Sequence, residues 1–258
     1  MKRLFTLLFM GSVSAFTAHA QYQLPNSGFE EWEDVSYKTY TGKEPVGWNS
    51  FLTGSGSLKG TAGRNQLEIM SESRPGSTGR KVLSSIFAQG NLTTGRINMG
   101  SMSATNADGN YNYTEIGDGK QNQKFTGLPD AMRIWVKYNS KHENHPYGKV
   151  CTILHTEGYY QDPMGNTEKI TAKLVGTAAK TDITSQAEWQ ELTIPFIYEA
   201  TTERPAYALV SFSSNTTPGQ GMNGDYMMVD DLEYLYYSEL ESLSYNGTEI
   251  FDIKKTDY

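Results

Sequence analysis

The chain has little cysteine, little positive charge and no apolar run long enough to cross a bilayer. Its single thiol, Cys151, cannot form a disulfide within the chain, so a packed core must hold the fold. Cys151 lies in the apolar run KVCTILH, which predicts a buried, unreactive thiol. The 29 acidic residues outnumber the 22 lysines and arginines. This balance argues against a nucleic-acid partner, because phosphate binding requires clustered positive charge.

The first twenty residues have the pattern of a secretory signal peptide. Lys2 and Arg3 supply positive charge, Leu4–Val13 is mostly apolar, and Ala18-His19-Ala20 matches a small-x-small cleavage site. We expect cleavage before Gln21. The mature protein is then exported, to the periplasm, the cell surface or the medium. The residue directly after the cleavage site is Gln21 and not cysteine, so a lipid anchor there is not expected.

Helical periodicity is nearly absent, and short alternating runs recur between clusters of Gly, Asn, Asp and Pro. This pattern predicts an all-β antiparallel sandwich or barrel over residues 21–238. Residues 239–258 are predicted to form a linker and one strand with an Asn246-Gly247 turn, either added to the sandwich or opening a further module. The predicted sandwich strands are Gln66–Ser71, Lys81–Ala88, Gly95–Ser101, Ala131–Tyr138, Lys149–Tyr159, Lys169–Gly176, Glu188–Tyr198, Ala206–Ser213 and Tyr226–Tyr237.

The run AMRIWVKY alternates cleanly between two faces. Its apolar face, predicted to meet the core, consists of Met132, Ile134, Val136 and Tyr138. Arg133 and Trp135 point the other way. A polar segment, Ser103–Thr126, is predicted to be a long loop, and it carries Tyr111 and Tyr113.

Catalytic motifs are scarce. The sequence has no G-x-S-x-G, and HENH differs from the zinc motif H-E-x-x-H in its spacing. Paired carboxylates could hydrolyse glycosides, but no spacing selects a pair. The candidates are Glu30, Glu31, Asp108, Asp118, Asp162, Asp225, Asp230 and Asp231.

One carboxylate stands apart. The alternation of YMMVDDLEYLYY places Asp230 on the apolar face of the last core strand, with Leu232 and Tyr234. A buried carboxylate must be hydrogen-bonded, ion-paired or bound to metal. Calcium, which takes oxygen ligands, and backbone N–H groups are the alternatives.

The two ends of this region resemble a known fold family. NSGFEEW near the start and MVDDLEYLYY near the end are similar to the terminal motifs of galactose-binding-like jelly-roll domains, including carbohydrate-binding modules. More closely, the chain resembles the carbohydrate metabolism domain of exported proteins from glycan-degrading Gram-negative bacteria. The pieces that carry this second resemblance span about residues 24 to 238 and are FEEWE, EPVGWNS, LPDAMRIWVKY, EWQELTIPFIYEATTERPAYALVSFSSN and GDYMMVDDLEYLYY.

The resemblance implies a jelly-roll β-sandwich with a role around glycans, and adjacent first and last strands. By position, Glu30 and Asp230 match the structural calcium ligands of the related binding modules. The tail, from ESLSYNG onward, resembles the first strand of an immunoglobulin-like repeat.

Three functions fit these features. The first is a module that binds a glycan or oligosaccharide, with ligand contacts expected from Trp135, Arg133, Tyr111 and Tyr113, because sugars stack on aromatic rings and bond to polar side chains. The second is a glycoside hydrolase that uses a carboxylate pair. The third is a structural or adhesive surface component, which would show an exposed apolar patch. Trp32 and Trp48 are expected to pack rather than bind.

Overall fold

The computed structural model describes residues 22–59, 67–69, 80–83, 89–222, 224–237, 243–245 and 248–251. Strands make up nearly all the regular structure in these ranges, alongside the 3-10 helix η1 (Thr167–Lys169). The expected leader and its cleavage site lie outside the described residues. No helix within them is long and apolar enough to span a membrane.

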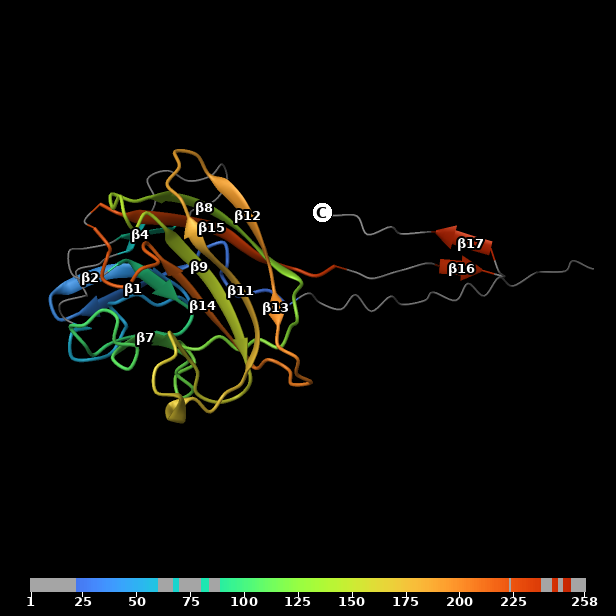
Figure 1. Cartoon of the computed structure of the whole chain (residues 1–258), viewed down its shortest axis with the longest axis horizontal. Helices are drawn as coiled ribbons and strands as arrows, with labels where there is room; N and C mark the ends of the chain where they lie inside the picture. Colours follow the sequence, from blue (N-terminus) through green and yellow to red (C-terminus); the bar gives the residue numbers. More distant parts are fainter. Residues whose placement is uncertain are drawn as a thin grey trace, which may run out of the picture.

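Two five-stranded antiparallel sheets form the body of the protein, as the jelly-roll prediction requires (Figure 1). We call the first the front sheet, in the order β13 (Ile197–Tyr198), β11 (Leu174–Ile183), β9 (Gly148–His155), β14 (Tyr207–Ser213) and β5 (Asn91–Thr93). The second is the back sheet, in the order β12 (Gln190–Pro195), β8 (Ala131–Asn139), β15 (Tyr226–Leu235), β4 (Arg80–Leu83) and β3 (Leu67–Ile69).

The core lies between the two sheets and follows the predicted alternation. On β8 the four residues of the apolar face are fully buried, and they meet Val210 and Phe212 of β14 in one cluster. Each such side chain stabilises the fold by about 1.5–3 kcal/mol relative to full exposure. The sandwich is therefore held by apolar burial, without a disulfide.

Trp48 is the central aromatic of this core. Its ring stacks on Phe212 at 5.3 Å between centroids and meets Phe29 at 5.0 Å. Its indole N–H donates to the carbonyl of Asn26, so its polar atom is satisfied. The prediction that Trp48 packs rather than binds is confirmed, and Trp32 also packs against the core.

The opening segment does not begin with a strand, although the resemblance implied that NSGFEEW would form a first strand beside the last one. Phe29 is buried but has a φ of 56°, and its N–H donates to the carbonyl of Asn26, which makes a turn. The first strand is β1 (Trp32–Tyr37), which forms a hairpin with β2 (Tyr40–Pro45). The opening segment nevertheless lies beside β15, because Leu232 donates its N–H to Ser27.

A third sheet covers part of the outer face of the front sheet. This cover sheet consists of β10 (Gln161–Asp162), β7 (Asn110–Tyr113) and β6 (Arg96–Met99). Tyr111 and Tyr113 therefore lie in a strand rather than the predicted loop. Their segment gains regular structure by pairing with the preceding strand β6 and the distant strand β10, which local composition did not reveal.

Two further predictions need correction. The segment 169–176 is not one strand, because it begins in the last residue of η1 and β11 starts only at Leu174. The helix η1 is capped by Asn166, which accepts from the N–H of Glu168. The tail has two strands, β16 (Leu243–Tyr245) and β17 (Thr248–Phe251), which pair with each other in a sheet of their own. The predicted Asn246-Gly247 turn lies outside the described residues.

Candidate functional site

A pocket of about 280 Å³ lies between the outer face of the front sheet and the cover sheet. We call it the front pocket. Its lining combines polar side chains from strands that are far apart in sequence. These are Asn91 of β5, Asn112 of β7, Lys149 of β9, Asp162 of β10, and Ser211 and Ser213 of β14.

One wall of the front pocket is apolar. Phe51 and Leu58, from the loop after β2, pack with Ile97 and Met99 of β6. The loop runs along β6 as an extra strand would, since the N–H of Ser55 donates to Ile97 at 2.7 Å and its carbonyl accepts from Met99 at 3.0 Å. The apolar wall is thus fixed by backbone bonds.

This close approach requires a glycine. Gly56 has a φ of +91°, and a Cβ there would lie 2.2 Å from the carbonyl oxygen of Met99. Both the left-handed backbone and the missing side chain are needed. Gly56 therefore lets the wall of the pocket form.

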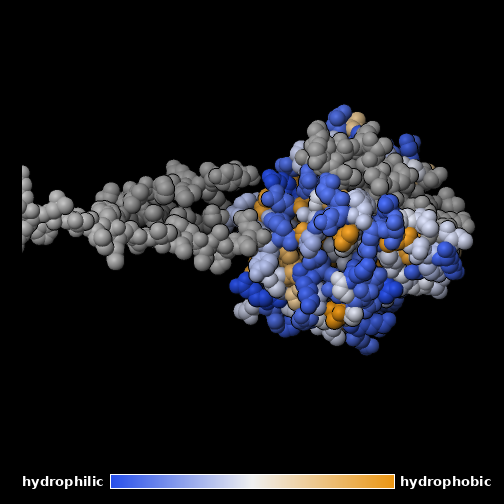
Figure 2. Space-filling model, turned by 180° about the vertical axis from the view of Figure 1, so that it is seen from behind, coloured by the Kyte–Doolittle hydropathy of each residue, from blue (hydrophilic) through white to orange (hydrophobic). Residues whose placement is uncertain are grey.

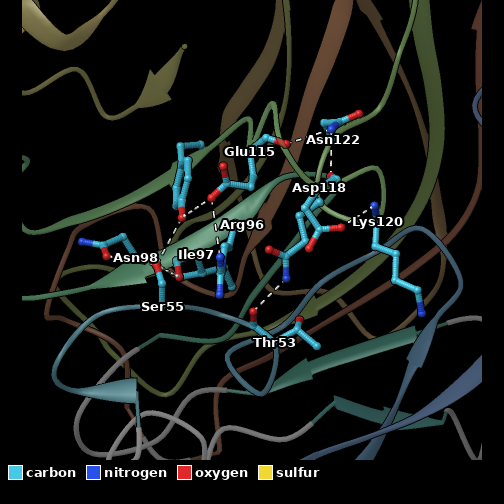
Figure 3. Close-up of polar contacts among 11 residues, drawn as sticks. Thr53, Ser55, Arg96, Ile97, Asn98, Glu115, Asp118, Lys120 and Asn122 are labelled. Atoms are coloured by element: carbon cyan, nitrogen blue, oxygen red, sulfur yellow. Dashed lines mark hydrogen bonds and ion pairs between the residues drawn. The ribbon is translucent and has the colours of Figure 1, made fainter.

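A polar network behind the wall ties the loop to the cover sheet (Figure 3). The Tyr113 hydroxyl donates to Glu115 at 3.1 Å and lies 3.4 Å from the Ser55 hydroxyl. Arg96 forms an ion pair with the same Glu115 at 3.5 Å. Burial, the main cause, raises the pKa of Tyr113, so this hydroxyl stays protonated as a donor.

The floor of the front pocket carries a charged pair. Lys149 Nζ lies 2.8 Å from an Asp162 carboxylate oxygen, and about a quarter of each side chain is exposed. Burial lowers the pKa of Lys149, but the Asp162 carboxylate outweighs this and the net pKa is raised. Lys149 therefore stays protonated at neutral pH, and an ammonium with three donors keeps capacity for a ligand.

Amides and hydroxyls complete the floor. Asn91 and Asn112 exchange side-chain hydrogen bonds at 3.0 and 3.3 Å, which fixes both amides. Ser211 stands opposite Cys151 in the sheet register, on the outer face. Cys151 is buried, as predicted, and burial raises its pKa to about 12.

A second, wider hollow of about 460 Å³ lies on the outer face of the back sheet. We call it the back hollow. Its lining includes Gln23, Arg133, Trp135, Glu191, Asp231 and Glu233. Arg133 and Glu233 are register partners on β8 and β15 and form an ion pair. The hydrogen bond to Glu233 raises the pKa of Arg133 further.

A β-bulge shapes the edge of the back hollow. The register of β15 against β8 shifts between Asp230 and Glu233, and Asp231 has a φ of 45°. Bulges re-aim side chains in this way. Asp230 consequently stands opposite Trp135, on the outer side of the sheet, and not on the core face with Leu232 as the alternation predicted.

Asp230 is fully buried, and one carboxylate oxygen accepts the N–H of Asp231 at 2.9 Å. Glu30 is exposed. Within the described residues, no group of three or more His, Cys, Asp or Glu is placed to hold a metal ion. One backbone donor thus satisfies part of the Asp230 carboxylate, and calcium binding by Glu30 and Asp230 stays a prediction.

Three of the four predicted ligand contacts line one or other of the two sites. Tyr111 lines the front pocket, whereas Trp135 and Arg133 line the back hollow. Tyr113 lines neither; its ring packs between Tyr111 and Tyr159, at 5.5 and 5.7 Å.

The floor of the front pocket was not predicted from the sequence. A usable signal was present in β14, where Ser211 and Ser213 alternate with the buried Phe212 and so mark a polar outer face. Lys149 and Asp162 gave no such signal. They lie on strands of two different sheets, β9 and β10, and meet only in the folded structure.

No family model and no curated protein matches the chain. Among solved structures, one described as a "putative glycoside hydrolase" from Bacteroides thetaiotaomicron is 16% identical, with a TM-score of 0.57 over 80% of this chain and 70% of that chain. Another of the same description, from Bacteroides vulgatus, is 17% identical, with a TM-score of 0.55 over 81% and 96%. The chain shares their fold.

A more distant structure is TmCBM61 in complex with β-1,4-galactotriose, 13% identical with a TM-score of 0.33, covering 83% of this chain and 97% of that chain. At 16% and 17% identity, the likeness to the two Bacteroides structures concerns the fold alone.

Proposed function

We propose that this protein is an exported saccharide-binding domain that holds its ligand in the front pocket without cleaving it. The observation that carries the proposal is the pairing, in one pocket, of a fixed polar floor with an apolar wall. Sugars present hydroxyls on their edges and C–H groups on their faces. The floor can bond the hydroxyls, and the wall can cover the C–H face.

The size of the pocket narrows the ligand. About 280 Å³ is just below the range of small-molecule sites, roughly 300–1,000 Å³. One or two sugar rings fit such a volume. The ligand is therefore a short saccharide or the end of a longer chain.

The charge of the floor suits neutral sugars. The Lys149–Asp162 pair offers a donor and an acceptor side by side without net charge. Adjacent hydroxyls can donate to a carboxylate and accept from an ammonium at once, through charge-assisted bonds. The two fold relatives are each described as a "putative glycoside hydrolase". This description, and the resemblance of the terminal motifs to carbohydrate-binding domains, support the same ligand class.

A glycan array of neutral and acidic saccharides, followed by calorimetry on the strongest hit, tests this function. Ser211→Val removes a floor hydroxyl from a strand that tolerates a β-branched residue, and Tyr111→Ala removes part of the lining. We expect each variant to weaken binding about three- to tenfold. Thr193→Val, on the exposed face of β12, is the matched control. Unchanged affinity in both pocket variants would refute the pocket as the site.

Glycoside hydrolysis is the second candidate, and the back hollow favours it. Among its described lining residues the front pocket has one carboxylate, Asp162, which is paired with Lys149. The back hollow has Glu191, Asp231 and Glu233. Of these two sites, as described, only the back hollow could therefore support a two-carboxylate mechanism. Release of reducing ends from a polysaccharide, abolished by both Glu191→Gln and Asp231→Asn, would establish it; we expect no release.

A further inference from the structure

The back hollow contains an aromatic side chain, Trp135, that has no role in the proposed function of the front pocket. Trp135 lies on the outer face of β8, alternating with residues that face the core, and it is not part of the core cluster. Its side chain is only partly buried and lines the hollow. A large aromatic surface left outside the core, inside a concavity, is suited to ligand contact.

Rigid polar groups surround this ring. Arg133 is two residues along the same face and is held by its ion pair with Glu233. Glu191 stands directly opposite Trp135 on β12 and is exposed. On the other side of the ring, the bulge carries Asp231 into the hollow's lining. Ring and polar groups thus lie on paired strands rather than on mobile loops.

The opening segment fixes the remaining edge. Ser27 and Gly28 line the hollow, and Ser27 accepts the N–H of Leu232 at 3.0 Å. A Cβ on Gly28 would lie 3.5 Å from a carboxylate oxygen of Asp231, so this residue packs closely against the bulge. The hollow is a preformed site.

We propose that the back hollow is a second saccharide site, in which the ring of Trp135 stacks on a neutral sugar and the flanking carboxylates and Arg133 bond its hydroxyls. Tryptophan offers the aromatic face that a pyranose C–H surface needs. Three carboxylates against one guanidinium disfavour uronic acids at this site. The open form of the hollow suits an internal stretch of a chain.

The two sites lie on outer faces of opposite sheets. One molecule can then hold two chains, or two parts of one chain, and gain avidity from the second contact. The back hollow does not depend on the front pocket, because the two share no lining residue.

Affinity electrophoresis tests this inference with gels containing β-1,4-galactan, xyloglucan, mannan or polygalacturonate. We expect Trp135→Ala to weaken retardation by at least one neutral polysaccharide about tenfold. Ser211→Val should keep the share of the retardation that is due to the back hollow. Trp189→Ala is the matched control, because Trp189 is also partly buried but lines neither site. Unchanged binding in Ser211→Val would count against the front pocket, whereas unchanged retardation in Trp135→Ala would count against the second site. The two failures can therefore be told apart.

A measurement on the unmutated protein guards against a folding defect in Trp135→Ala. N-bromosuccinimide oxidises accessible tryptophans, and peptide mass spectrometry locates the product. We expect fragments of the neutral polysaccharide that retards the protein to protect Trp135, and not Trp189, from oxidation. The second site is refuted by equal oxidation of Trp135 with and without the fragments, by no loss of retardation in Trp135→Ala, or by a loss confined to polygalacturonate.

Discussion

The side-chain amide of Gln23 forms both hydrogen bonds with the Tyr234 backbone that a neighbouring strand would otherwise form. Its Nε2 donates to the Tyr234 carbonyl at 2.6 Å, and its Oε1 accepts the Tyr234 N–H at 2.7 Å. Both bonds of a backbone pair are thereby made by one side chain. The last strand of the sandwich is satisfied at this point by a residue 211 positions away.

Gln23→Ala should destabilise the fold by about 1–3 kcal/mol, because it removes two bonds from a partly buried backbone pair. Urea unfolding followed by circular dichroism measures the change. Gln123→Ala, which removes an amide bonded to the adjacent Lys124, is the control and should change stability by less. Equal effects of the two substitutions would contradict the role assigned to Gln23.

His155 should make the fold less stable in mild acid. Its ring is fully buried, with nitrogens 2.7 Å from the Thr114 hydroxyl and 2.8 Å from the Thr156 carbonyl. Burial lowers its pKa to about 4, against an ordinary value of 6.5. Between these values the unfolded chain binds a proton that the folded chain does not, so stability falls as pH drops from 6.5 to 4.

The loss from His155 should reach about 3 kcal/mol, given 1.36 kcal/mol per pKa unit. Urea unfolding at pH 7.5, 5.5 and 4.5 measures it. His155→Gln should be less stable at pH 7.5 but lose less on acidification, whereas His142→Gln should keep the full pH dependence. An equal pH dependence in His155→Gln and the unmutated protein would exclude His155 as the source.

Cys151 should not react with iodoacetamide in the native protein at pH 8. Its thiol is buried and its pKa is raised to about 12, so almost no thiolate is present or accessible. In urea the same residue should label within minutes. Intact-mass spectrometry follows both reactions, and rapid native labelling would show that the front sheet opens at β9.

Calcium should raise the melting temperature if Glu30 and Asp230 form the predicted site. At a hundredfold excess over Kd the ion would add about 2.7 kcal/mol, and a chelator would remove it. Glu30→Gln, at an exposed position, should abolish the dependence without a large loss of basal stability. A melting temperature unaffected by chelator and calcium would remove the metal prediction.

The sequence predicted those parts of the fold that depend on alternation within one strand. β8 alternates cleanly, so its range and core face were predictable, as was the burial of Trp48. The turn at Phe29 and the bulge at Asp231 were not, because each depends on a positive φ at a residue that ordinarily avoids it.

The candidate sites show the same division. Trp135 and Arg133 could be selected because they share the outer face of one strand. The front pocket could not, since its floor combines residues of β5, β7, β9, β10 and β14. Pairing across such separations is a tertiary property that single-strand periodicity does not encode.

The antiparallel course of the opening segment beside β15 has a mechanical consequence. Tyr236 donates its hydroxyl to the Tyr22 carbonyl, Gln23 bonds Tyr234, and Leu232 bonds Ser27. A pulling force applied at residues 22 and 237 therefore breaks these contacts one after another, starting from the pair nearest the two ends. The domain should yield at low tension from its ends, while the same bonds resist heat and denaturant together.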